Sequence, residues 1–471
     1  MIDKNKIVSV LLRMMLIMVC FVCSMLSQRS NTDTVVLICV VFYALLCLAS
    51  NIPFVLKYTA FLAGAGLAII GTYIIESSDI WLGELRKYSY HVGAFPLISA
   101  YYLLFLFSLE LFNEHYSRKK KRGGRIVVIS GHANWITSVL DIAEYLVFLV
   151  TVIMTARLFP HFAILEKLDR FGYRARYIHG IWERIANYYI YFIPFLLINW
   201  DRHKHRLITI LTLSMYVLYL FMQGEKFGNY SVLLLFCMMY AVSYVHINQE
   251  TKKTWKRMIR VVVGVIIASF GVVMLQYTLF PSSTSALEHL KERLAQQGQL
   301  WWSIYSIQRG ESPKIEEISD ELEVYDTENK NGSEPYYGIY KVMYLSAPRS
   351  VVTSKISTGS TYTESTAASL YYYFGASALP IFALIMGWYF SFLAYKYADY
   401  IRRRCIIEAL IVTRLILLSR PFFSNSAFSF LFGADTVFTV ILVLMCAIIR
   451  HLYGTAKPSP CELIIVSERL N

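Results

Sequence analysis

Charged residues are scarce in this chain of 471 residues. Only 16% are Asp, Glu, Lys or Arg, whereas a soluble domain carries roughly 25%. Apolar residues make up 56%, and the mean hydropathy is +0.47. So few charges argue against a soluble globular domain.

The motifs of several enzyme classes are also missing. We find no Walker loop, dinucleotide fingerprint, HExxH pair or nucleophile elbow. A nucleotide-driven pump is therefore disfavoured. Cys20 and Cys23 have the spacing of a redox motif, but they lie in an apolar run without the strand–helix context of that motif, which favours a structural role. We expect no metal and no cofactor.

What the sequence does contain is a series of long apolar runs. A helix needs about 20 apolar residues to cross a hydrocarbon core of about 30 Å. Candidate spans lie near 7–27, 34–50, 54–76, 93–112, 136–158, 185–200, 207–222, 229–247, 260–280, 367–396, 405–420 and 428–450. The pattern predicts an all-α polytopic integral membrane protein with about twelve transmembrane helices.

The basic residues predict the orientation of these spans. Lys and Arg concentrate in cytoplasmic loops, and the run 118–122 is the strongest such marker. Counting alternate loops from it places the basic residues of 202–206, 252–257 and 402–404 on the same side. Both termini are then cytoplasmic. Because the positive charge sits in short loops, the net charge of +13 does not indicate nucleic-acid binding.

The predicted organisation has four parts. Residues 1–280 hold spans one to nine and an arginine-rich periplasmic loop, 159–184. Residues 281–366 form a large periplasmic loop, and residues 367–453 hold the last three spans. Residues 454–471 are a cytoplasmic tail. A loop as long as 281–366 is uncommon without a function.

Positive charge in the outward loop 159–184 departs from the usual bias. Arg174, Arg176 and Arg184 lie there with His179 among them. Guanidinium groups suit bidentate phosphate binding, so the cluster suggests an anionic ligand such as a lipid pyrophosphate. Contact with anionic lipid headgroups, or pairing with the acidic stretch 311–334, would also account for it.

Two further segments carry candidate site residues. The turn GEKFG at 224–228 places Glu225 and Lys226 at the membrane boundary, where ionisable groups are costly and tend to be functional; an ordinary polar turn is the alternative. In the large loop, Trp301 and Trp302 offer aromatic faces for sugar rings. Interfacial anchoring explains the tryptophans equally well.

The layout resembles the Wzy-type O-antigen polymerases of bacteria. Two stretches carry the resemblance in sequence. GEKFG at 224–228 looks like the GEKF-type turn of some of these proteins, and ERLAQQGQLWW at 292–302 looks like a segment of their large periplasmic loop.

The resemblance implies a glycosyltransferase of the inner membrane, a multi-pass protein that joins repeat units carried on undecaprenyl pyrophosphate at the periplasmic face. Its partners would be that lipid-linked oligosaccharide, the bilayer and a chain-length regulator protein, with no nucleic acid. The candidates for pyrophosphate binding are Arg174, Arg176, Arg184, Arg349, Arg420 and Lys226. Those for the catalytic base are Glu225, His179 and Glu364, and those for sugar binding are Trp301, Trp302 and Tyr337.

Other functions stay open. A flippase or other transporter also fits twelve spans, but transporters often have two related halves, and we find no internal repeat. A membrane O-acyltransferase would usually place a histidine deep in the membrane beside polar partners, and that pattern is not evident. A purely structural protein is disfavoured by the many ionisable groups near the outward surface.

Overall fold

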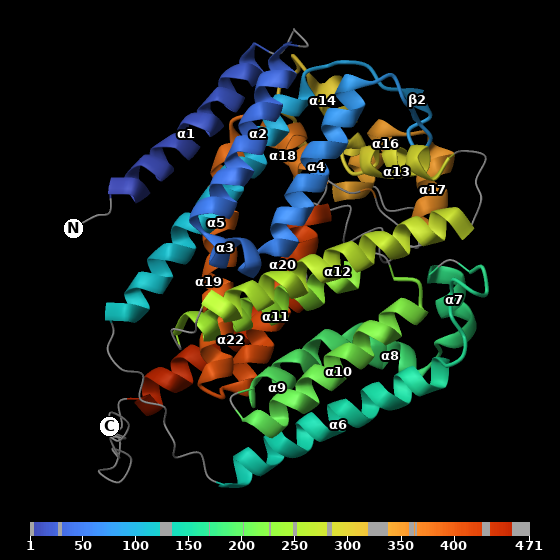
Figure 1. Ribbon diagram of the computed structural model, residues 1–471. Helices are drawn as coiled ribbons and strands as arrows, with labels where there is room; N and C mark the ends of the chain where they lie inside the picture. The colour runs from blue at the N-terminus through green and yellow to red at the C-terminus, as the bar shows by residue number, and fades with distance from the viewer. Residues whose placement is uncertain are drawn as a thin grey trace. The chain divides into compact units, whose positions relative to one another are not determined.

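The computed structural model describes residues 4–26, 31–122, 134–168, 170–200, 202–225, 228–247, 252–279, 285–318, 338–357, 362, 365–425 and 434–454. These ranges are almost entirely helical (Figure 1) and include one two-stranded hairpin, β1 (Trp81–Leu82) with β2 (Lys87–Tyr88). The chain forms two compact units. Unit 1 comprises Met1–His115, Ser283–Phe392 and Ile416–Val437, and unit 2 comprises Tyr116–Ser282, Leu393–Leu415 and Phe438–Asn471.

Eight helices in the described ranges are long and apolar enough to cross a membrane. Their large apolar side chains are often exposed, as Leu11 (60%) and Ile38 (63%) are. Such surfaces are unfavourable in water and suit lipid. The protein is therefore an all-α membrane protein. The apolar segments lie in α1 (Lys4–Met25), α2 (Asn31–Ser50), α4 (Thr59–Ser77), α5 (Ala94–Arg122), α6 (Asn134–Leu158), α10 (His203–Met222), α11 (Gly228–Ile247) and α19 (Ala378–Arg402).

Two of the predicted spans are divided between helices. The span at 54–76 is divided between α3 (Ile52–Lys57) and α4, and that at 367–396 between α18 (Ser365–Phe374) and α19. Gly375 separates the latter pair at a φ of +74°, a conformation that glycine adopts without strain. Three further helices overlap predicted spans but are not among the eight: α12 (Lys252–Leu279), α20 (Ile406–Asn425) and α22 (Ala434–Gly454). A total of twelve crossings stays a prediction.

In unit 1 a charged pair joins two apolar helices. Arg13 of α1 is only 3% exposed, and its guanidinium donates to the carboxylate of Glu110 in α5. Asn51 donates to the other oxygen of Glu110 at 2.8 Å. A buried charge needs such a partner in an apolar environment, so this pair ties α1 to α5.

The large loop has its own helices, and the first two of them pack on the end of α4. They are α13 (Ala286–Ala295), α14 (Gln299–Gln308), α16 (Gly338–Ser346) and α17 (Arg349–Ser357). Helix α13 ends at Ala295, and α14 begins after Gly298. A Cβ on Gly298 would lie 2.4 Å from the backbone nitrogen of Thr72 in α4. The turn therefore requires glycine, because backbone approaches backbone there.

This contact predicts the effect of one substitution. Gly298→Ala should destabilise the protein by about 1–3 kcal/mol, since an added methyl group overpacks a contact between two backbones. The measurement is the midpoint of thermal unfolding of the purified protein in detergent. Gly66→Ala in α4 is the matched control, because nothing lies within 4 Å of its Cβ position. Equal midpoints for the two variants would contradict the close approach.

In unit 2, α6, α10 and the chain that connects them run side by side (Figure 1). Arg202, at the start of α10, pairs with Asp141 near the start of α6 at 2.9 Å, and Thr155 near the end of α6 donates to the carbonyl of Met215 late in α10. The two helices are therefore parallel, and the chain between them must return along their length. It does so through α7 (Arg170–Tyr177), α8 (Ile181–Tyr188), the 3-10 turn η1 (Tyr189–Phe192) and α9 (Ile193–Leu197).

Contacts along α6 trace this return. Trp182 lies against Arg157 at the end of α6, and Tyr189 is 2.6 Å from Thr151 between their hydroxyl oxygens. Asn199 then donates to Asp141 at the beginning of α6. The segment predicted as a sixth span at 185–200 is thus an interrupted helix that covers the length of α6. The arginine-rich segment 159–184 lies at the end of α6 and α10.

Candidate functional site

The segment after α6 is fastened to the end of α10 by backbone contacts. The amide of Ala163 donates to the carbonyl of Met222 at 2.8 Å. Tyr173 of α7 is fully buried, and its hydroxyl donates to the carbonyl of His161 at 2.8 Å. These contacts hold α7 and its arginines in one place.

A small cleft opens at this end of unit 2. Its walls come from the last turn of α6, from α7 and the residue after it, and from α8 and α10: Met154, Arg157, Leu158, Tyr177, Ile178, Trp182 and Tyr219. The guanidinium of Arg157 lies over the ring of Trp182, 4.7 Å from its centroid. Three aromatic side chains beside a cation suit an anion that carries an apolar or sugar group.

The predicted phosphate ligands of unit 2 lie on α7 and α8, the two helices that contribute Tyr177 and Trp182 to the cleft. Arg174 donates to the side chain of Asn187 at 2.5 Å. The Arg176 side chain is 64% exposed and lies 3.9 Å from Glu166. Arg184 is exposed on α8. Among the described residues, Arg157, Arg174 and Arg184 form no ion pair, so their charge is available to a ligand.

A histidine, a glutamate and a tyrosine are linked beside the cleft. Nδ1 of His161 lies 2.6 Å from a carboxylate oxygen of Glu166, and the hydroxyl of Tyr177 donates to the other oxygen. The rings of His161 and Tyr177 stack with centroids 4.7 Å apart. The His161 side chain is 46% exposed. A carboxylate on Nδ1 leaves Nε2 to accept a proton, which is the arrangement of a general base.

The electrostatics of this group favour an ionised Glu166. The hydrogen bond from Tyr177 is the largest cause of a lowered Glu166 pKa; burial opposes it, and the contact with His161 adds to it. The same hydrogen bond raises the pKa of Tyr177. Glu166 therefore stays negative, and Tyr177 stays neutral, across the physiological range.

The lowered pKa predicts a pH dependence of stability. A carboxylate with a depressed folded pKa stabilises the fold above its ordinary value, about 4.3 for Glu, and loses that contribution as pH falls through the folded value. The midpoint difference between wild type and Glu166→Gln should therefore shrink as pH falls below the ordinary Glu value and through the lowered folded pKa. Thermal unfolding in detergent across pH measures it. A difference that instead grows in acid would contradict the assignment.

Glu225 of the GEKFG turn is buried and paired. Its carboxylate accepts from Arg170 at 3.0 and 3.2 Å and from the side chain of Asn229 at 3.0 Å. Gly224 has a φ of +69°, and a Cβ on Gly228 would lie 3.2 Å from the Glu225 carboxylate. The turn thus holds the counterion of Arg170. This placement favours a positioning role for Glu225 over that of the catalytic base.

Of four further predicted site residues, the structure describes one, His179. His179 is exposed, and its Nε2 lies 2.9 Å from the carbonyl of Arg176, so this nitrogen already has a backbone neighbour. Lys226, Tyr337 and Glu364 lie outside the described residues.

Comparison with known families gives one match. Residues 333–440 match the model of a family of unknown function (DUF6418). The matched stretch begins in the large loop and extends through α16 to α20 into α22. No curated protein and no solved structure matches the chain.

The predicted site residues in unit 1 have different environments. Trp301 and Trp302 are fully buried, and their indole nitrogens donate to the carbonyls of Ala94 and Tyr90 at 2.9 and 3.0 Å. Burial covers the ring faces, so the sugar platform predicted on them is corrected to a structural role that fixes α14 against the start of α5.

The two unit 1 arginines remain candidates by position. Arg349 is exposed at the first residue of α17, and Arg420 is half-buried in α20. Both belong to unit 1, whereas Arg174, Arg176 and Arg184 belong to unit 2. Their part in binding pyrophosphate stays a prediction.

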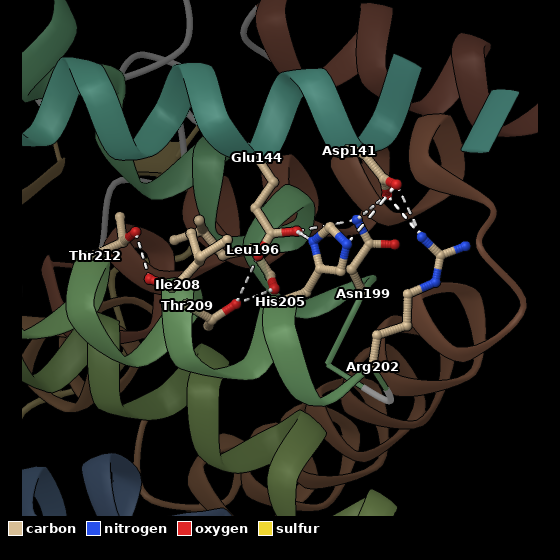
Figure 2. A network of polar contacts seen from close by, with 9 residues as sticks. All are labelled: Asp141, Glu144, Leu196, Asn199, Arg202, His205, Ile208, Thr209 and Thr212. Carbon is tan, nitrogen blue, oxygen red and sulfur yellow. Dashed lines mark hydrogen bonds and ion pairs between the residues drawn. The ribbon is translucent and has the colours of Figure 1, made fainter. Parts of the chain in front are cut away.

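A polar network occupies the opposite end of α6 (Figure 2). Glu144 is fully buried; it accepts from Asn199 at 3.0 Å and Thr209 at 3.2 Å, and lies 2.7 Å from Nδ1 of His205. Asp141 is paired with Arg202. Every carboxylate of the network has a partner, as buried charge requires. We assign it a structural role.

Sequence reasoning missed four residues of the candidate site. Arg157 falls in the last turn of a predicted span, and His161, Glu166 and Trp182 follow in or near the arginine-rich loop. The one signal in the sequence was the density of aromatic and basic residues in 159–184. The pairing of His161 with Glu166 depends on how the loop folds back, and no helical or strand periodicity encodes it.

Proposed function

We propose that this protein is a polymerase of lipid-linked oligosaccharides in the bacterial inner membrane, of the O-antigen type. The observation that carries the proposal is the cleft at the end of α6. It combines Arg157, which forms no ion pair among the described residues, three aromatic side chains and, beside Tyr177, the pair of His161 and Glu166. The predicted topology places this end on the periplasmic side, where lipid pyrophosphate carriers present their sugars.

The proposed reaction joins the growing chain to an acceptor hydroxyl of the incoming unit. The bond between the anomeric carbon and the pyrophosphate oxygen breaks, and a bond from that carbon to the acceptor oxygen forms. Nε2 of His161 takes the acceptor proton and later releases it to solvent. The lipid pyrophosphate leaves with the bonding electron pair, so its negative charge increases.

The arginines supply the electrostatic part of this scheme. Arg157 and Arg174 would bind the pyrophosphate, and Arg176 and Arg184 would increase the positive potential around it. Fixed cations stabilise a leaving group whose charge develops in the transition state. Because the glycosyl-phosphate bond supplies the energy, the proposed mechanism requires no nucleotide.

Deletion of the gene in the source bacterium tests the proposal. Lipopolysaccharide should retain core plus a single repeat unit, while the ladder of longer chains is lost. Complementation with the wild-type protein should restore the ladder. Loss of the single unit as well would overturn the proposal and favour a flippase, because a flippase supplies every unit at the periplasmic face.

A further inference from the structure

Three side chains with metal-binding groups meet in unit 1. Asp33 lies at the start of α2, Glu76 at the end of α4, and His91 between β2 and α5. Each offers one ligand atom, and these atoms all lie within 4.8 Å of one another. Nε2 of His91 is 3.1 Å from Oδ2 of Asp33 and 3.5 Å from Oε2 of Glu76.

The two carboxylates are buried, and only one of them is well satisfied. The Glu76 side chain is fully buried, and it accepts backbone hydrogen bonds from Val92, Gly93 and Ala94 at 2.9, 2.9 and 3.1 Å. The Asp33 side chain is 7% exposed, and its Oδ1 has no hydrogen-bond partner among the described residues. A buried carboxylate oxygen without a partner is costly and calls for an explanation such as an ion.

A protonated His91 would not neutralise both carboxylates. An imidazolium carries one positive charge against two carboxylates, and its contact is with Oδ2 of Asp33. Oδ1 of Asp33 is left without a donor. A divalent cation would balance the charge of both carboxylates. A cation bound to the Asp33 carboxylate would also lie close to its second oxygen, Oδ1.

We propose that Asp33, Glu76 and His91 bind a divalent transition-metal ion, with Zn²⁺ as the reference ion. One imidazole nitrogen and two carboxylate oxygens suit zinc and its neighbours better than an all-oxygen set would. The His91 side chain is 28% exposed, which gives an ion a route to the buried oxygens. The expectation from sequence that the chain binds no metal changes accordingly.

Such an ion would fasten three segments of unit 1 that are distant in sequence. It would join the start of α2 to the end of α4 and to the loop before α5. Its role is structural, and it is independent of the proposed polymerase. Binding to the folded state alone raises thermal stability as the ion concentration rises.

The test uses the full-length protein purified in detergent without a histidine tag. After treatment with EDTA and its removal, zinc is titrated while bound metal and the thermal unfolding midpoint are measured. We expect one ion per chain and a midpoint that rises with zinc and falls again with EDTA. No saturable binding, or a midpoint that zinc leaves unchanged, would overturn the proposal.

Variants locate the ion. Asp33→Asn and His91→Ala should lose saturable zinc binding. His289→Ala is the matched control, because its side chain has a similar exposure (27%) and also lies beside a carboxylate, Glu292. The EDTA-reversible midpoint of the wild type is an independent criterion, because it does not depend on the folding of a ligand variant. Zinc binding that survives in Asp33→Asn, or is lost in His289→Ala, would place the ion elsewhere and refute this site.

Discussion

If the protein is the polymerase proposed above, replacing His161 with alanine should slow chain transfer by about a hundredfold to ten-thousandfold, the usual contribution of a positioned general base. Its Nδ1 is 2.6 Å from Glu166, which leaves Nε2 to take the acceptor proton. The rate is measured with purified protein and lipid-linked repeat units, and the ladder is measured in cells. Glu166→Gln should have a smaller effect in the same direction, because the glutamine leaves the imidazole in place without its anionic partner.

The comparison with two other histidines makes this result specific. His289→Ala, in the large loop, should leave the rate unchanged. His179 is the rival base within the same segment, and its Nε2 lies near the carbonyl of Arg176. Loss of activity in His179→Ala combined with full activity in His161→Ala would move the base and refute the assignment.

The second large effect is expected for Arg157, which lines the cleft, and for Arg174 on α7. Arg157→Ala and Arg174→Ala should each reduce the rate by about a hundredfold to a thousandfold, as removal of one donor to a developing anion does. Lysine at either position should restore part of the rate, because it keeps the charge but loses the planar fork.

A control separates this effect from a general loss of positive charge. Lys204 lies at the opposite end of unit 2, where its ammonium is 5.8 Å from the centroid of the Tyr145 ring. Lys204→Ala should leave the rate unchanged. Protein level is compared by immunoblot in every strain. A complete ladder from both arginine variants would refute the assignment of pyrophosphate binding to these arginines.

Two motifs that carried the family resemblance have structural explanations in this fold. In the stretch 292–302, Gly298 permits the close approach to α4, and the two tryptophans are buried against the start of α5. In GEKFG, Glu225 is the counterion of Arg170. Each motif positions neighbouring segments within its own unit, α14 in unit 1 and Arg170 in unit 2.

The amino-acid sequence determined the class of this protein and the region to search. Apolar runs near 20 residues long led to an all-α membrane protein, because lipid requires each backbone polar group to be satisfied within its own helix. Excess arginine in 159–184 marked one segment as unusual. Both are local properties that can be read along the chain.

Only the tertiary structure decided which side chains meet. It turned the predicted span at 185–200 into an interrupted return beside α6, covered Trp301 and Trp302, and joined Asp33 to Glu76 and His91. These outcomes depend on burial and on hydrogen bonds between distant segments. The energy of a buried polar group depends on the partners that packing supplies. Hydrophobic periodicity does not predict these partners.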